Sequence, residues 1–218
     1  MNVADISDIP LRRLKTLELV TFPSETYAVM QLLTFPLLTD LTIGSNSNSD
    51  PSMYTLLADS IVAAIDRSFC QITSLTLHTV DSACVVRILR HTPWVENLDL
   101  GSIQSAQAVL LQLVDPSLCV PHLRSFSLEC IANEGVKCIG PLVSMIQSRR
   151  RRRRSSSEGG GSGGHLRMVN LTLWEKRGGD PFVAVLQPLA KETGVAIVVN
   201  AVQFGGALKS GDFVVTRV

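Results

Sequence analysis

The sequence predicts an α/β solenoid, in which short parallel strands alternate with helices and each repeating unit stacks on the next. Three observations support this prediction. One nine-residue pattern of aliphatic positions recurs along the chain, several segments between its copies have helical periodicity, and the spacing of the copies is nearly regular. The 218-residue chain is 45% hydrophobic but only 5% aromatic, which predicts a substantial core built mainly from Leu, Val and Ile.

The recurring pattern is aliphatic-x-x-aliphatic-x-aliphatic-x-x, closed by an aliphatic, aromatic or Asn residue. Its period-two centre is typical of a strand with one buried face. A strand, a turn and a returning helix cannot bury their apolar faces alone, so the units are expected to stack into a horseshoe, with a parallel concave sheet and helices on the convex side. The central residues of six full copies and a weaker seventh are Leu17, Leu41, Leu75, Leu98, Phe126, Val169 and Ile197.

Four segments between these strands are predicted to be helical. They are residues 24–36, 54–68, 81–93 and 105–116. Ser24 precedes polar residues and an apolar stripe in the order of a capping box. Asp81 and Ser105 are expected N-caps, and Pro93 and Pro116 are expected to end their helices.

The spacing of the central residues defines the domain. Successive intervals are 24, 34, 23, 28, 43 and about 28 residues, against about 20–29 for leucine-rich repeats. The two long intervals contain the polar segments 45–52 and 149–164, and without the latter the longest interval falls to 27. We therefore expect one leucine-rich-repeat domain of about seven irregular units over residues 1–199, with a disordered insert at 149–164 and a C-terminal tail or cap at 200–218. An ordinary three-layer α/β fold is the alternative.

The repeat phrases resemble the leucine-rich-repeat region of F-box-type proteins, especially the large, divergent fungal sets. The likeness lies in residues 35–43, 88–100, 120–131 and 165–173. The resemblance implies a non-catalytic protein-interaction module that recognises substrates of a ubiquitin ligase. Only ten residues precede Leu11, so an F-box is not visible, and binding to the ligase adaptor is not expected.

Side chains that flank the central aliphatic residues are expected to project from the concave face. They are rich in hydroxyl groups and include four carboxylates but no Lys or Arg, which favours a partner with basic or hydrogen-bonding character. The alternative is that they are ordinary solvated strand residues. The candidate partner-binding residues are Thr16, Glu18, Asp40, Thr42, Ser74, Thr76, His78, Asn97, Asp99, Ser125, Ser127, Glu129, Met168, Asn170 and Thr172.

A run of six arginines dominates the charge distribution. The net charge is +1, but without the run the remaining 14 basic and 19 acidic residues give −5. Because like charges repel and Ser and Gly follow, we expect a disordered basic loop. The alternative function is that this loop serves nuclear import or binds nucleic-acid backbones. A second possibility is that it directs a kinase to Ser155 and Ser156. A third is that it is a low-complexity expansion without function. The loop residues are Arg149, Arg150, Arg151, Arg152, Arg153 and Arg154.

The sequence carries no pattern that indicates catalysis or a cofactor. The four histidines belong to different repeats, no HExxH or CxxC motif occurs, and 159–164 lacks the Lys-Ser/Thr ending of a phosphate-binding loop. We therefore expect no enzyme activity, no cofactor and no metal. No apolar stretch approaches the roughly 20 residues of a membrane span, no signal peptide is visible, and the five cysteines are odd in number. These features predict an intracellular protein, cytoplasmic or nuclear, with reduced thiols packed in its core.

Overall fold

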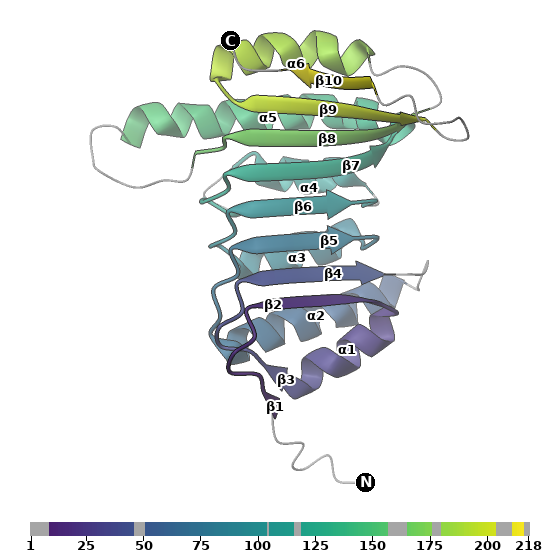
Figure 1. Cartoon of the computed structure of the whole chain (residues 1–218), viewed down its shortest axis with the longest axis vertical. Helices are drawn as coiled ribbons and strands as arrows, with labels where there is room; N and C mark the ends of the chain where they lie inside the picture. Colours follow the sequence, from purple (N-terminus) through teal and green to yellow (C-terminus); the bar gives the residue numbers. More distant parts are fainter. Residues whose placement is uncertain are drawn as a thin grey trace.

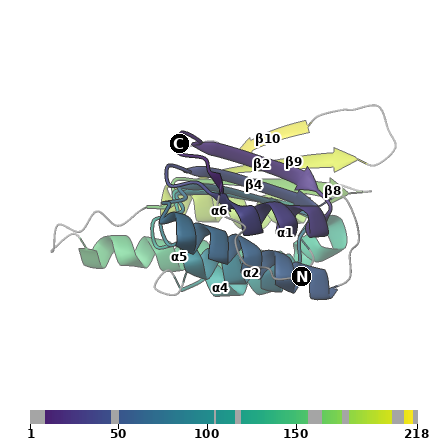
Figure 2. The same ribbon diagram turned by 90° about the horizontal axis from the view of Figure 1, so that it is seen from below.

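A computed structural model describes residues 9–45, 51–103, 105–115, 119–156, 165–175, 180–203 and 211–215. Within these residues the protein has two layers, a single large sheet and a set of helices on one of its faces (Figures 1 and 2). Figure 2 shows the strands as one layer and helices α1, α2, α4, α5 and α6 as the layer beneath. The predicted α/β class is confirmed, and the helices of the described residues leave the other face of the sheet open, unlike those of a three-layer fold.

Seven strands of the large sheet are parallel and follow one another across it in chain order. The register aligns the seven central residues predicted from sequence as one row, from Leu17 in the first strand to Ile197 in the last. The parallel strands are β2 (Thr16–Thr21), β4 (Asp40–Ser45), β5 (Ser74–His78), β6 (Asn97–Gly101), β7 (Ser125–Ile131), β8 (Met168–Glu175) and β9 (Ala196–Gln203).

Three further strands lie at the ends of the molecule. β10 (Gly211–Val215) pairs antiparallel with β9 and borders the sheet beyond it. β1 (Ile9–Pro10) and β3 (Leu33–Thr34) form a separate, short parallel pair. Part of the segment 200–218, which the sequence left as a tail or cap, thus continues β9 and adds one strand to the sheet.

Each helix packs against the helix of the next unit. Four of them correspond to the predicted helical segments, whereas the sequence analysis assigned no helix to the regions of α5 and α6. The helices of the described residues are α1 (Pro23–Leu32), α2 (Pro51–Ser68), α3 (Ser82–His91), α4 (Ala106–Leu113), α5 (Ala132–Ser156) and α6 (Asp180–Thr193).

The predicted helix caps have mixed outcomes. Asp81 caps α3, and its carboxylate accepts a hydrogen bond of 3.0 Å from a backbone N–H of the first turn. Ser105 precedes α4 but has a left-handed backbone (φ 56°) and makes no side-chain cap. The capping box at Ser24 is wrong, because α1 already begins at Pro23, whose fixed φ suits the first helical position. Pro116 lies outside the described residues.

Helix α5 departs most from the sequence prediction. It continues without a break through residues 149–156, where the sequence predicted the start of a disordered loop. That prediction is wrong for 149–156, whereas 157–164 lie outside the described residues. Arginine has a high helix propensity, and Arg149 packs inside the protein with only 5% of its surface exposed. The arginine run therefore begins inside a helix, and its first residue is anchored in the protein interior.

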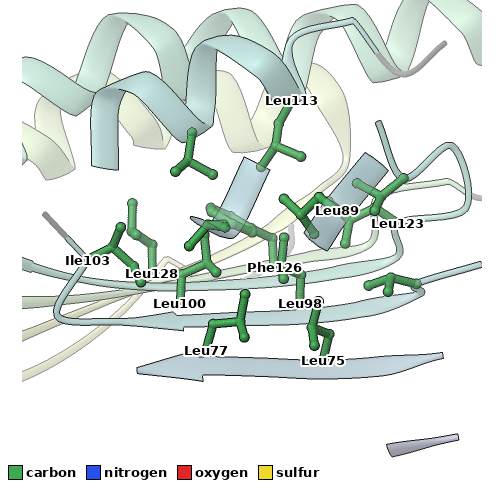
Figure 3. Close-up of a cluster of buried hydrophobic side chains, with 14 of the residues drawn as sticks. Leu75, Leu77, Leu89, Leu98, Leu100, Ile103, Leu113, Leu123, Phe126 and Leu128 are labelled. Carbon is green, nitrogen blue, oxygen red and sulfur yellow. The ribbon is translucent and has the colours of Figure 1, made fainter. Parts of the chain in front are cut away.

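The core fills the space between the sheet and the helices. Figure 3 shows strand residues such as Leu98, Leu100 and Phe126 pointing toward Leu89 of α3 and Leu113 of α4. The same aliphatic positions predicted from the repeat pattern are buried in β4 to β9. Burial of these side chains is the main source of the fold's stability.

Candidate functional site

The sheet face without helices is the first candidate site. In β2, β4, β5 and β6, buried or half-buried aliphatic residues alternate with more exposed ones, as strand geometry requires. Across β2 and β4 to β8, the less buried positions include all the candidate residues predicted from sequence, and the register arranges them in rows across neighbouring strands. We call this surface the open face. Its first row is Thr16, Asp40, Ser74, Asn97, Ser125 and Met168, its second is Glu18, Thr42, Thr76, Asp99, Ser127 and Asn170, and its third includes His78, Glu129 and Thr172.

Several polar groups of the open face bind one another. The Asn170 amide donates to the Ser127 hydroxyl at 3.3 Å, which joins β8 to β7. The Trp174 indole N–H donates to the Glu129 carboxylate across the same pair of strands. Trp174 is not among the candidate residues predicted from sequence. The alternation from Val169 onward places it on the open face, and that alternation is the signal that could have found it.

His78 lies at a special position in the third row. Its neighbours in register are Gly44 and Gly101. A Cβ atom added to Gly101 would lie 1.8 Å from Nδ1 of His78, so the imidazole covers this glycine. Val20 approaches Gly44 in a similar way, since a Cβ atom added there would lie 3.2 Å from its Cγ1. The two glycines therefore let side chains from adjacent strands lie flat on the sheet.

The described outward positions of the three rows carry acidic groups but no Lys or Arg. The carboxylates belong to Glu18, Asp40, Asp99 and Glu129. Adjacent strands lie about 4.8 Å apart, so carboxylates on adjacent strands are separated by about one Debye length, ~8 Å, at physiological salt. The open face therefore attracts positively charged groups.

A second candidate site is a basic pocket of about 480 Å³ at the amino-terminal ends of β8 and β9. It lies where the last turns of α5 meet the segment before β8 and the turn between α6 and β9. We call it the basic pocket. Its lining residues are Ile146, Arg149, Arg150, His165, Leu166, Arg167, Thr193, Gly194, Val195 and Ala196.

The first two arginines of the run have structural contacts at this pocket. Arg149 is buried, and its guanidinium donates to the backbone carbonyls of Val120 (3.0 Å), Leu113 (3.3 Å) and Cys119 (3.4 Å). Arg150 forms an ion pair of 2.6 Å with Glu192 of α6. These two residues therefore do not belong to a solvated loop. The side chains of Arg151, Arg152, Arg153 and Arg154 lie outside the described residues; Ser155 and Ser156 end the backbone of α5.

An aromatic pair lies near the amino-terminal ends of β6 and β7. The rings of Trp94 and His122 stack with centroids 5.2 Å apart and an angle of 11° between their planes. Trp94 is half exposed. The ion pair between Arg124 and Glu96 (3.0 Å) connects the same two strands. The pairing was not predicted from sequence, because it joins residues of two units.

The four histidines occupy separate places. His78 is on the open face, His122 stacks on Trp94, His165 lines the basic pocket, and His91 lies 3.7 Å from Asp66. Among the residues that the structure describes, no group of three or more His, Cys, Asp or Glu is arranged to hold a metal ion.

None of the helices in these parts of the chain has the length and apolar character needed to cross a membrane.

Comparison of the chain with protein families, with curated proteins and with solved structures gives no significant match.

All five cysteines are buried and none is in a disulfide, so we predict low thiol reactivity in the native state. Burial raises the pKa of Cys70 from its usual 9.0 to about 11 and that of Cys84 to about 12. At pH 8 the thiolate fraction of Cys70 is then about 100-fold lower than in an unfolded chain. Alkylation by iodoacetamide, followed residue by residue with mass spectrometry, should be at least that much slower than in urea. Equal rates in both states would contradict the buried placement.

The same shifts give stability a pH dependence. An unfolded chain loses its thiol protons near pH 9, whereas the native chain retains them to about pH 11 at Cys70. The contribution of the two thiols to the free energy of unfolding is therefore fully present below pH 9. It is lost as the pH rises toward 11–12, and the free energy of unfolding falls by about 1.4 kcal/mol per thiol for each pH unit. Urea midpoints measured between pH 8 and 11 should fall across this window. Substitution of both residues by alanine serves as the control and should reduce the fall.

Proposed function

We propose that the chain is a non-catalytic protein-interaction module, built as a leucine-rich-repeat solenoid, that binds its partner on the open face. The observation that carries this proposal is a sheet of seven parallel strands in chain order, one face of which is left open by every helix of the described residues. Parallel sheets usually have both faces covered, whereas stacked repeats leave an extended surface for a partner. The resemblance to F-box repeats supports the narrower proposal that the partner is a ubiquitin-ligase substrate.

The charge of the open face specifies the partner further. Glu18, Asp40 and Asp99 project from three different strands, and no Lys or Arg lies in the rows that surround them. The hydroxyl and amide groups between them supply both donors and acceptors. A partner segment that carries Lys or Arg and exposed polar groups complements this surface. Charge complementarity of this kind mainly increases the association rate and the specificity.

A test compares substitutions on the two faces. Thr76 and Ser127 lie in the second row of the open face, and arginine at both positions should block it by bulk and by inverted charge. Gln107→Arg on the exposed side of α4 is the matched control. Proteins captured from cells by each variant are quantified by mass spectrometry. We expect partners retained by the control to fall at least about tenfold with Thr76→Arg/Ser127→Arg.

Equal capture by the control and the double variant would contradict binding at the open face. Circular dichroism and urea unfolding should show that the double variant is folded, because both positions lie outside the core. A captured partner that carries a basic segment, and whose binding weakens with salt, supports the proposed charge complementarity.

The alternative function, nucleic-acid binding through the arginine run, receives less support. Two of the six arginines have partners within the fold. Arg149 donates hydrogen bonds to backbone carbonyls, and Arg150 forms an ion pair with Glu192. These contacts hold both side chains against the body of the protein, so the two residues are not part of the disordered basic loop on which nucleic-acid binding was predicted.

A further inference from the structure

We propose that the basic pocket binds the phosphate group of an anionic ligand. The pocket combines residues from three separate segments, namely the end of α5, the segment that leads into β8, and the turn between α6 and β9. Its volume of about 480 Å³ lies within the range of small-ligand sites, about 300–1,000 Å³. This site is distinct from the open face and does not depend on the function proposed for it.

The charge of the pocket favours an anion. Arg149, Arg150 and Arg167 all line it. Glu192, the carboxylate that pairs with Arg150, has a side chain that is 62% exposed, so the ion pair is open to solvent and weak. Three guanidinium groups and one carboxylate leave an excess of positive charge, which excludes a cationic ligand.

Each arginine contributes differently. Nη1 and Nη2 of Arg149 donate to backbone carbonyls of Val120, Leu113 and Cys119, so this residue adds positive charge to the lining while these donors are already engaged. Arg150 is half-buried and held by Glu192. Arg167 is exposed, and the structure gives it no carboxylate partner among the residues it describes. Arg167 is therefore the group best placed to donate hydrogen bonds to an incoming anion.

The carboxyl end of α6 opposes anion binding, because its last carbonyls carry partial negative charge. This helix-dipole effect is small at an exposed site and is screened by salt. A charge-assisted hydrogen bond from arginine is stronger, and the planar guanidinium matches the oxygens of a phosphate. The positive charge therefore outweighs the helix end.

Apart from His165 and Thr193, the remaining lining is apolar and indicates what the phosphate is attached to. Ile146, Leu166 and Val195 contribute to the wall and are buried in the core behind it. A ligand with an uncharged body next to its phosphate fits this combination better than inorganic phosphate alone. The phosphate could belong to a free nucleotide or to a phosphorylated side chain of a protein, and the experiment separates the two.

The test uses the full chain with Arg151 to Arg154 changed to Gln, which removes nonspecific attraction by the rest of the run. Isothermal titration at fixed ionic strength measures binding of pyrophosphate, ATP and a phosphoserine peptide. We expect binding of at least one probe. Arg167→Gln should weaken it about tenfold or more, and Glu192→Gln should strengthen it, because a competing carboxylate is removed. Arg13→Gln, which changes an exposed arginine at the other end of the chain, should leave it unchanged.

The proposal is overturned if none of the probes binds, or if Arg167→Gln and Arg13→Gln have equal effects. It is also overturned if binding occurs only while Arg151 to Arg154 are intact, because the run and not the pocket would then carry the anion. Stronger binding of ATP than of the peptide assigns a free nucleotide, and the reverse order assigns a phosphorylated protein. Both orders support the phosphate site.

Discussion

Replacement of Arg149 by alanine is expected to destabilise the protein by about 3 kcal/mol or more. The guanidinium of Arg149 donates to three backbone carbonyls in the segment 113–120. Only 5% of the surface of this residue is exposed to solvent. Loss of this group leaves buried acceptors without their donor, which costs about 1–3 kcal/mol for each group. Urea unfolding followed by circular dichroism measures the effect.

The neighbouring residue provides the control. Arg150→Ala removes an ion pair whose two side chains are 27% and 62% exposed, so the expected loss is only about 0.2–1 kcal/mol. If Arg149→Ala and Arg150→Ala have equally small effects, the end of α5 is not anchored and the loop predicted from sequence describes it better. Arg149→Lys should fall between them, because lysine keeps the charge but not the planar set of donors.

Replacement of Leu110 by alanine is expected to cost about 2–5 kcal/mol of unfolding free energy. Leu110 of α4 is 0% exposed and belongs to the hydrophobic core, so its truncation leaves a cavity that the surrounding side chains fill only partly. The adjacent Leu111 is 53% exposed, and Leu111→Ala should change stability by less than about 0.5 kcal/mol. Chemical unfolding of both variants measures the difference, and a similar cost at the two positions would contradict the orientation of α4.

The strands were predictable because their signal is local. A period-two pattern identifies a strand and its buried face within a few residues, and the repeated pattern then aligns Leu17 with Leu41 and the later centres. The composition of the open face follows from the same alternation. Trp174 could have been assigned to it by continuing the count from Val169.

The features missed by sequence reasoning depend on contacts between distant segments. Six arginines in a row indicate repulsion and solvent exposure, but the carbonyls that bury Arg149 come from residues 29–36 positions earlier in the chain. The basic pocket likewise joins His165 and Arg167 to Arg150 of α5 and Thr193 of α6. No periodicity in the sequence carries such information. The start of α1 was missed for a local reason instead, because Pro23 takes the first helical position, one residue before the expected cap at Ser24.

The aligned row of strand centres has a consequence for how such a chain can vary. Neighbouring members of the row are separated by as few as 23 residues, from Leu75 to Leu98, and by as many as 43, from Phe126 to Val169, yet they occupy equivalent positions in the sheet. Insertions and deletions in the connections therefore leave the geometry of the open face unchanged. A single residue added inside a strand would instead move its outward side chains to the buried side. Variation in length is confined to the connections, and recognition can change by substitution alone.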